Sequence, residues 1–394
     1  MKIEIKELIN IEMTLEILEK LPDYRVTKEK IEYDQRDVLF GVLCSMFVGN
    51  IEIKDKHNWL EVNFNENYFK RLIGKENEEL KTPSYSTVRR MIINIDSTIL
   101  EEMFRAYFIP KVEFNEKTQL AVDGKTMNAS GRKGKYTVKR NVGMLNVVET
   151  ASKIVIAHRE LGAKKSEIPE FQKVLEMEFS DKPFLYTFDA LNTQVESLNG
   201  IEAKGKRYLA KVKGNQKTLL KQVSQAFEEE SAKANNTILE EKDKRESIEG
   251  NKWVKRETFV LSSKNDELLI DNSSFRHIKS IIKQVKYISD NEGKRKVKEQ
   301  YLIANFLESA TYFKEGIKDH WRCETYHYYK DRLTKEDDCK ISVNPFGLAI
   351  LRSFVINCIQ LHLNKHKPDN KSLNMSGIFK SCGNNPHFLG RLVT

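Results

Sequence analysis

The chain has 394 residues, of which 40% are hydrophobic and 31% charged, and its formal net charge is +9. This length allows two or three domains with a sizeable core, and the composition excludes a disordered chain. The sequence has no run of about 18 apolar residues, so we expect no membrane-spanning segment. We also expect no secretory signal, and five scattered cysteines without a CxxC pair favour the cytoplasm. The basic excess favours a polyanionic partner such as nucleic acid.

The first part of the chain, residues 1–110, has the apolar spacing of helices. One long helix is predicted over 87–108. Ser84 or Ser86 is expected to cap its start, because short hydroxyl side chains accept hydrogen bonds from the first free N–H groups. Pro110 is expected to end this helical block.

From residue 119 onward, short apolar strands replace the helical spacing. Three strands come first, and strands then alternate with helices, which predicts a mixed sheet covered by helices. The predicted strands cover 119–124, 142–149, 153–160, 183–189 and 207–213, and the helices cover 169–178, 193–205 and 215–230.

The last part of the chain divides into three stretches of different character. Residues 229–250 are charged and polar, which is typical of a surface loop or a domain boundary. Three strand-like runs between 252 and 306 predict a β-rich insertion. Residues 311–364 have helical spacing again, and the polar tail from Lys365 is expected to pack loosely.

Two aspartates each follow a predicted strand and are candidates for metal binding. Asp123 follows the run LAV, and Asp189 follows LYTF. Sites in open α/β sheets form at the carboxyl ends of strands, and carboxylate oxygens are the ligands that Mg²⁺ prefers. An Asp after a strand is also a common turn former or helix cap, so a structural role stays open.

A third carboxylate is expected from the C-terminal helical part. The spacing of His320, Glu324, His327 and Asp331 puts all four on one face of a helix. This stripe fits a metal-binding or DNA-binding face, or simply a solvated face with aromatic residues on the core side. A zinc site is a further alternative, although the HExxH pattern is missing.

Several short motifs resemble those of bacterial insertion-sequence transposases of the H-repeat-associated group, and they occur in the same order. The motifs are LPDYR (21–25), PSYSTVRRM (83–91), AVDGKT (121–126), KSEIP (165–169), TFDALNTQ (187–194), VKGNQKTL (212–219), YLIANF (301–306), HWRCE (320–324) and HYYKD (327–331). The chain departs from the family pattern at Ser166, Cys323 and Thr325. His327 also follows Glu324 by one residue fewer than the family pattern has.

The resemblance implies a ribonuclease H-like mixed sheet flanked by helices, with a β-rich insertion and an N-terminal helical domain. The implied domains are an N-terminal helical DNA-binding domain (1–112), the first part of the catalytic core (113–228), the insertion (229–308), and the C-terminal helical part of the core with the tail (309–394).

The resemblance also implies a transposase of the Asp-Asp-Glu type, in which Asp123, Asp189 and Glu324 are the catalytic and metal-binding residues. They would hold two Mg²⁺ ions, with Mn²⁺ as a possible substitute. Asp331 and Glu336 compete with Glu324 for this role, and Glu324 is preferred because it follows the His-Trp pair as the family's glutamate does.

The implied partner is double-stranded DNA, both element ends and target, bound by a homodimer in the cytoplasm without a membrane. Basic, aromatic and imidazole side chains near the motifs are the candidates for DNA contacts. They are Arg89, Arg90, Lys125, Arg132, Lys133, Lys213, Lys217, His320, Trp321, His327 and Lys330. The alternatives are a catalytically inactive, sequence-specific DNA-binding protein derived from a transposase, or a metal-dependent nuclease that cuts DNA without joining it.

Overall fold

The structure of the chain is a computed structural model. It describes residues 3–390 apart from 26–30, 129, 131, 134–137, 140, 162–166, 233–238, 250–251, 264–269, 271–274, 276, 291–292, 339–340, 342 and 386.

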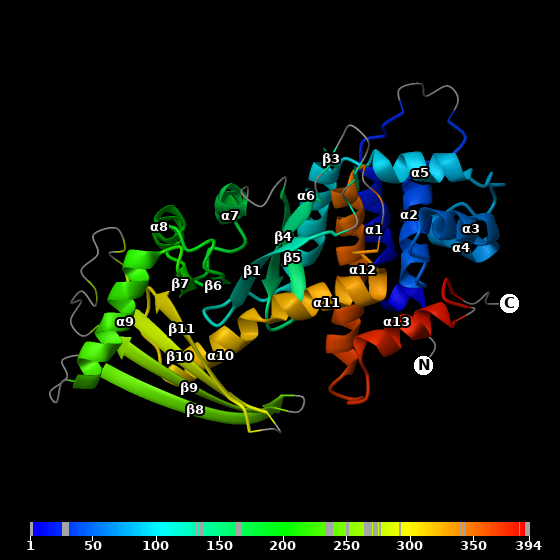
Figure 1. Cartoon of the computed structure of the whole chain (residues 1–394). Helices are drawn as coiled ribbons and strands as arrows, with labels where there is room; N and C mark the ends of the chain where they lie inside the picture. Colours follow the sequence, from blue (N-terminus) through cyan, green and yellow to red (C-terminus); the bar gives the residue numbers. More distant parts are fainter. Residues whose placement is uncertain are drawn as a thin grey trace.

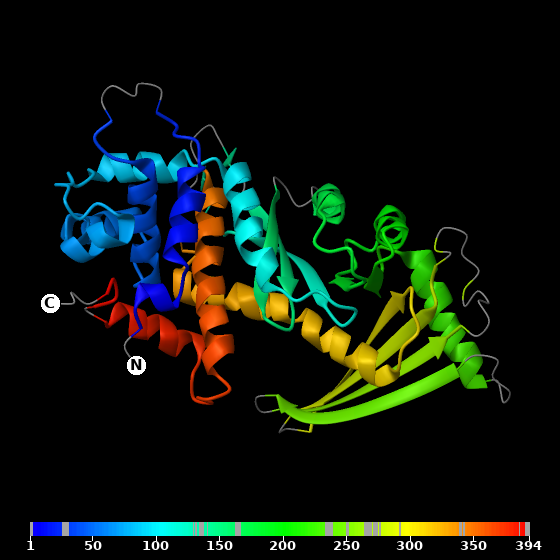
Figure 2. The same cartoon turned by 180° about the vertical axis from the view of Figure 1, so that it is seen from behind.

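The molecule is elongated, with a helical body at one end and a β-rich part at the other (Figures 1 and 2). Both termini lie in the helical body, close to helix α13. The described helices are α1 (Ile11–Glu19), α2 (Gln35–Phe47), α3 (Ile53–Asn63), α4 (Asn67–Ile73), α5 (Tyr85–Ile93), α6 (Ser97–Phe108), α7 (Glu167–Glu176), α8 (Val195–Ala203), α9 (Lys217–Ala232), α10 (Ala310–His320), α11 (Arg322–Thr334), α12 (Pro345–His366) and α13 (Met375–Gly383).

One nine-stranded sheet runs through the molecule in the order β5-β4-β1-β6-β7-β11-β10-β9-β8. Its strands are β1 (Gln119–Thr126), β4 (Gly143–Glu149), β5 (Ile154–Leu161), β6 (Leu185–Phe188), β7 (Arg207–Val212), β8 (Leu239–Glu249), β9 (Lys252–Ser262), β10 (Ser280–Ser289) and β11 (Arg295–Ala304). A separate ribbon pairs β2 (Arg132–Lys133) with β3 (Val138–Lys139).

Five strands of this sheet, in the order β5-β4-β1-β6-β7, have the arrangement of a ribonuclease H-like core. β5 pairs antiparallel with β4, and β4 pairs antiparallel with β1. β1, β6 and β7 then run parallel. Helices α7 and α8 contact this core on one side, and α10 and α11 lie along the other side (Figure 1). The predicted mixed sheet flanked by helices is therefore confirmed.

The β-rich part continues the same sheet. β11 joins β7 through four antiparallel residue pairs, from Tyr301 with Val212 to Ala304 with Leu209. The three predicted strands of the insertion are present as β9, β10 and β11. The expectation of a loop over 229–250 was wrong for residues 239–249, which form β8 along β9. Charged residues suit this strand because β8 is the edge of the sheet, and its described side chains, 243–249, are exposed or half-buried.

The central element of the helical body is α12. It contacts α2, α5, α6, α11, α13 and β5, and nearly all of its residues are buried. It is the one described helix that is long and apolar enough to cross a membrane, and 94% of its most apolar window is buried inside the protein. Apolar residues on every side of a helix are expected where the helix lies inside a core.

The single helix predicted over 87–108 is two helices in the structure. α5 ends at Ile93, and α6 starts after Asp96, whose side chain accepts hydrogen bonds from the N–H groups of Thr98 and Ile99. This cap gives a new helix start where the apolar spacing alone indicates continuity. The predicted cap at Ser84 is present, because its side chain accepts from the N–H of Thr87.

The tail beyond Lys365 is packed, which corrects the expectation of a loose end. Helix α13 buries Met375, Ile378 and Cys382, and it contacts α2, α11 and α12. Phe388 is also buried, and its carbonyl accepts a hydrogen bond from the N–H of Ile5. A few apolar residues in a polar segment are therefore enough to fix it against the helical body.

Candidate active site

Asp123 lies in the middle of β1, not at its end as the sequence predicted. β1 continues to Thr126, and Asp123 is opposite Asn146 on β4. The preceding residues Leu120, Ala121 and Val122 are fully buried, so they fix the strand in the core. The Asp123 side chain is 22% exposed. It is therefore held by a rigid strand and still open to an incoming molecule.

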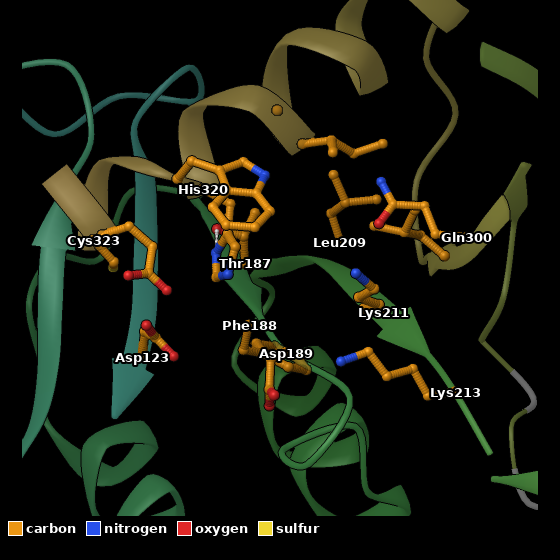
Figure 3. Close-up of a pocket in the computed structure, with 15 residues that line it drawn as sticks. Asp123, Thr187, Phe188, Asp189, Leu209, Lys211, Lys213, Gln300, His320 and Cys323 are labelled. Atoms are coloured by element: carbon orange, nitrogen blue, oxygen red, sulfur yellow. Dashed lines mark hydrogen bonds between the residues drawn. The ribbon is translucent and has the colours of Figure 1, made fainter. Parts of the chain in front are cut away.

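Asp189 follows the last residue of β6, which runs parallel to β1 with Phe188 beside Val122. The register puts Asp189 on the strand next to Asp123 (Figure 3). One of its carboxylate oxygens, Oδ1, accepts a hydrogen bond from the N–H of Leu191 at 2.8 Å. Asp189 therefore forms the turn that the sequence left open as an alternative, and it also lines the pocket described below.

Glu324 lies in the first turn of α11 and is exposed. The neighbouring thiol of Cys323 is buried and donates to the carbonyl of Ala121 at 3.3 Å, which attaches α11 to β1. A carboxylate is also favoured in the first turn of a helix, because the free N–H groups there are partly positive. This contact brings Glu324 to the pocket that Asp123 lines.

The predicted continuous helix from 311 to 331 is broken at Trp321. α10 ends at His320, and α11 begins at Arg322. His320 therefore does not share a helix with Glu324, which corrects the four-residue stripe. The remaining three positions of that stripe lie on α11.

One pocket brings the three predicted carboxylates together with basic, aromatic and apolar side chains (Figure 3). Its walls come from β1, β6, β7, β11, α10 and the start of α11. The lining residues are Asp123, Thr187, Phe188, Asp189, Leu209, Lys211, Lys213, Gln300, Leu302, Gly316, Ile317, His320, Trp321, Cys323 and Glu324.

Burial and neighbouring carboxylates raise the pKa of Asp123 to about 7. Burial is the largest cause, followed by repulsion from Glu324, Asp189 and Glu167. Within the described ranges, no three His, Cys, Asp or Glu side chains are grouped so as to hold an ion as they stand. Carboxylate oxygens are nevertheless the donors that Mg²⁺ prefers, and a divalent cation would relieve the repulsion that Asp123 experiences.

His327 is buried beside Asp123 and is neutral. Burial, together with the charges of Lys330 and Lys125, lowers the pKa of His327 to about 3. Its Nε2 is 3.1 Å from the side-chain nitrogen of Asn146, which donates to it, so the ring proton is on Nδ1. Nδ1 lies 3.8 Å from the Asp123 carboxylate. His327 therefore lies buried behind Asp123, which corrects the expectation that it contacts DNA.

His320 lines the pocket and is also neutral. Burial lowers the pKa of His320 to about 4. Its Nδ1 is 3.1 Å from the hydroxyl of Thr187, and Gln119 donates to that same hydroxyl. Gln119 also donates to the carbonyl of Gly316 on α10, so this network joins β1, β6 and α10 at the pocket wall.

Two lysines, Lys211 on β7 and Lys213 directly after it, reach the pocket from the side opposite Asp123 (Figure 3). Lys213 was predicted as a phosphate contact. Lys211 was not among the predicted contacts. It lies two residues before Lys213 on the same predicted strand, so both side chains point to the same face, and this spacing could have identified it. Burial and Lys213 lower the pKa of Lys211. Lys217 is exposed at the start of α9, outside the pocket lining.

Trp321 is 58% exposed and lines the pocket. The alternative of a tryptophan packed in the core is therefore wrong for this residue. An exposed indole ring at a charged pocket is available for stacking on a base.

The structure corrects the expectation that Lys330 contacts DNA. Its side chain has no exposed surface, and its Nζ lies 2.6 Å from the Glu336 carboxylate. A fully buried ammonium group cannot reach a phosphate. Lys125 is also engaged, because its side chain is 8% exposed and pairs with Asp331 at 2.9 Å and with Asp337 at 3.0 Å.

Two of the remaining basic candidates lie away from the pocket lining. Arg89 and Arg90 are exposed on α5 in the helical body. The backbones of Arg132 and Lys133 form β2, and their side chains lie outside the described part of the structure. Ser166, where the sequence departs from the family motif, also lies outside the described residues.

Comparisons with known proteins give consistent similarities. A family model described as "Transposase DDE domain" matches residues 115–355, and one described as "DDE_Tnp_1-associated" matches residues 15–108. The H repeat-associated protein YhhI of Escherichia coli is 26% identical over 337 residues, covering 83% of this chain and 84% of YhhI. YncI of Escherichia coli is 28% identical over 222 residues, covering 56% of this chain and 84% of YncI. Both relatives are named as transposases.

Among solved structures, the chain is similar to the piggyBac transposase in a synaptic complex with hairpin DNA. The identity is 12%, the TM-score is 0.47, and the match covers 96% of this chain and 76% of that one.

Proposed function

The chain belongs to the family of transposases with a DDE domain, and on that premise we propose that it cuts DNA at insertion-sequence ends and joins them to target DNA. The observation that supports this activity best is the shared pocket of Asp123, Asp189 and Glu324. These carboxylates come from two parallel strands and a helix that the sequence separates widely. Besides burial, the charges of Glu324 and Asp189 disfavour the ionised form of Asp123. A bound cation would balance these charges.

In this proposal Asp123, Asp189 and Glu324 hold two divalent cations, Mg²⁺ with Mn²⁺ as a substitute. The cations, when bound, supply the positive charge that activates a water and stabilises the leaving oxygen. Asp123 would be a ligand held on a rigid element, because it lies in the middle of β1. His327, neutral and with its proton on Nδ1 toward Asp123, orients that carboxylate without competing for its charge.

The other residues of the pocket position DNA. Lys211 and Lys213 contact phosphate oxygens beside the scissile bond, and Trp321 offers a ring for an unstacked base. Attack of water on the phosphorus breaks the bond to the 3′ oxygen and leaves a free 3′-hydroxyl. That hydroxyl then attacks a phosphorus of the target DNA in the same pocket. The new bond joins the two strands, and the target's bond to its own 3′ oxygen breaks, which releases that oxygen as a free 3′-hydroxyl.

Recognition of the element end is assigned to the N-terminal helices 1–112, with Arg89 and Arg90 on α5 as exposed contacts. The protein acts in the cytoplasm on double-stranded DNA, as a homodimer that brings two element ends together. Replacing both arginines by alanine tests this assignment, because it should reduce the preference for end DNA over random DNA. An unchanged preference would move recognition to another surface.

A cleavage and joining assay tests the proposed activity. Purified protein is incubated with a labelled end fragment and target DNA in Mg²⁺ or Mn²⁺, and the products are separated on a denaturing gel. Cleavage followed by joining supports the proposal. Cleavage without joining identifies a nuclease, and binding without cleavage identifies an inactive DNA-binding protein. The Asp123→Asn variant controls for contaminating nucleases.

A further inference from the structure

The sheet face that lines the pocket continues outward along the strands of the β-rich part. Gln300 on β11 lines the pocket, and Lys298 lies two residues before it, so both side chains point to the same face about 7 Å apart. Gln300 donates to Gln284 at 2.8 Å, and Gln284 donates to the hydroxyl of Thr258 at 3.2 Å. This face, called the pocket face, therefore runs from the pocket across β11, β10 and β9.

Four basic residues form one row across the pocket face, one on each of four neighbouring strands. The register puts Lys298 opposite Lys286, Lys286 opposite Arg256, and Arg256 opposite Arg245 on β8. Neighbouring strands lie about 4.8 Å apart, so this basic row is about 14 Å long. Like charges directly opposite each other destabilise a sheet. The basic row therefore lowers the stability of the fold, which indicates a role in binding.

The acidic groups near the basic row balance only part of its charge. Glu249 lies 2.5 Å from Arg256 and 3.0 Å from Lys286, so one carboxylate serves two cations. Arg245 lies 3.8 Å from a carboxylate of α10. Lys298 is exposed, and no acidic residue in the described part of the chain forms an ion pair with it. The row therefore keeps a positive charge that is open to solvent.

The opposite face of the same strands shows a different pattern. In the adjacent row on that face, Lys244 lies opposite Glu257, so the register brings unlike charges together. Lys283 on the same face lies 3.2 Å from Glu299. A row of like charges is therefore a property of the pocket face and not of exposed strands in general.

The basic row and the helical body lie on opposite sides of the pocket. In the sheet order, the strands β1 and β6 lie between β5, which contacts α6 and α12, and the strands β11 to β8 of the row. The two views show the same order along the molecule, with the far ends of β8 to β11 extending beyond α10 (Figures 1 and 2). A DNA duplex whose scissile bond lies in the pocket therefore reaches the helices on one side and the basic row on the other.

We propose that the basic row binds the phosphates of the DNA that flanks the insertion sequence, beyond the scissile bond. This inference rests on the proposed function, in which the N-terminal helices hold the element end. Lysine and arginine contacts to phosphates carry no sequence information, which suits flanking DNA because its sequence differs between insertion sites. Each DNA strand has a phosphate about every 3.4 Å of helix axis, so a row of about 14 Å faces about four phosphates.

The test measures binding of the full-length protein to two labelled DNA duplexes by fluorescence anisotropy, in chelator-containing buffer. One duplex stops at the cleavage position of the element end, and the other continues into flanking DNA for about one helical turn, roughly 10 base pairs. The row variant is Lys286→Gln with Lys298→Gln. The matched control, Lys244→Gln with Lys283→Gln, removes two positive charges from the opposite face.

We expect the row variant to bind the flanked duplex about tenfold more weakly at about 0.1 M salt. The slope of the logarithm of the binding constant against the logarithm of the salt concentration should fall by about 2 for this duplex. Binding of the shorter duplex should not change, and the control should bind both duplexes as the unaltered protein does. Unchanged binding of the flanked duplex by the row variant would overturn the proposal. An equal loss on both duplexes, or an equal loss in the control, would also overturn it.

Lys298→Glu keeps the test decisive if the row variant does not fold. The new carboxylate lies opposite Lys286, so this variant should unfold at the same or a higher temperature and still bind the flanked duplex more weakly. Normal binding of the flanked duplex by this variant would reject the role of the row. These measurements need no cleavage. A protein that binds flanking DNA through the row but does not cut would therefore overturn the proposed function alone.

Discussion

Helix α11 carries two charged regions that differ in how their charge is balanced. At its start, Glu324 lies at a pocket with Asp123 and Asp189, and no described Lys or Arg forms an ion pair with these carboxylates. The neutral His327 lies 3.8 Å from Asp123. Further along the same helix, Lys330 pairs with Glu336 in the interior. Asp331 pairs with Lys125.

This difference shows which of the carboxylates is structural. Asp331, the rival of Glu324 in the sequence, has a lysine partner and lies outside the pocket lining. A balanced pair fixes α11 against β1, because breaking a buried pair costs free energy. A carboxylate without a cationic partner destabilises the folded protein. Such groups are found mainly where function requires them. The two regions should therefore respond in opposite ways when a charge is removed.

The largest expected effect is the loss of DNA cleavage when the pocket loses a charge. Glu324→Gln, Asp123→Asn and Asp189→Asn should each lower Mg²⁺-dependent cleavage by about three orders of magnitude or more, because each removes a ligand of the cations. DNA binding should persist, because lysines and arginines supply the phosphate contacts. Asp331→Asn is the matched control and should retain most of the activity. Equal losses for Asp331→Asn and Glu324→Gln would erase the distinction between the two regions.

A smaller effect is expected on stability when the buried pair is broken. Lys330→Met should lower the free energy of unfolding by about 3 kcal/mol, because Glu336 is then left charged, buried and unpaired. Replacing both residues, with Glu336→Leu added, should restore most of that loss, since no buried charge remains. Urea denaturation of both variants measures this. A single variant as stable as the unaltered protein would show that this pair does not fix α11.

Removing a charge from the pocket should raise the stability of the folded protein, whereas breaking the buried pair lowers it. Folding raises the pKa of Asp123 from 3.8 to about 7, so its ionisation destabilises the folded protein increasingly as pH rises through this interval. In chelator-containing buffer at pH 8, the free energy of unfolding of Asp123→Asn should therefore be higher by about 2 kcal/mol. This is less than the shift in pKa alone would give, because the Asp123 side chain is partly exposed to water. The gain should vanish below about pH 3, where the carboxyl is neutral in both states. A destabilised Asp123→Asn at pH 8 would contradict the unbalanced charge.

The smallest effect separates two lysines that the sequence treats alike. Lys125→Met should reduce stability by about 1 kcal/mol through its partners Asp331 and Asp337, and it should leave the salt dependence of DNA binding unchanged. Lys213→Met should leave stability unchanged. It should lower by about 1 the slope of the logarithm of the DNA-binding constant against the logarithm of the salt concentration. Thermal unfolding and binding titrations at several salt concentrations measure both. Interchanged results would place Lys125 on the DNA surface.

Much of the fold follows from the sequence because its strands are strongly patterned. The strands β4, β5, β6 and β7 lie within one or two residues of their predicted positions. The misplaced features depend on single contacts that spacing does not reveal. Asp96 starts a new helix by capping it, and Trp321 separates α10 from α11. The strand β8 was missed because an edge strand tolerates the charged residues that also mark a loop.

The site was predictable only in part, for a related reason. Asp123 and Asp189 follow from their positions on strands, but whether a lysine is paired, buried or free depends on residues far along the chain. Lys125 meets Asp331 more than two hundred positions away, a pairing that no local pattern indicates.

Helix α12 has a consequence for how this protein is made. The faces of α2, α6 and β5 that it covers are translated long before α12 itself. In a growing chain this apolar surface therefore stays exposed until residue 366 has left the ribosome. A chain that stops before residue 345 never buries it. We expect such truncated products to be degraded and not to persist as fragments that compete for DNA. The cell would then contain either the whole protein or none.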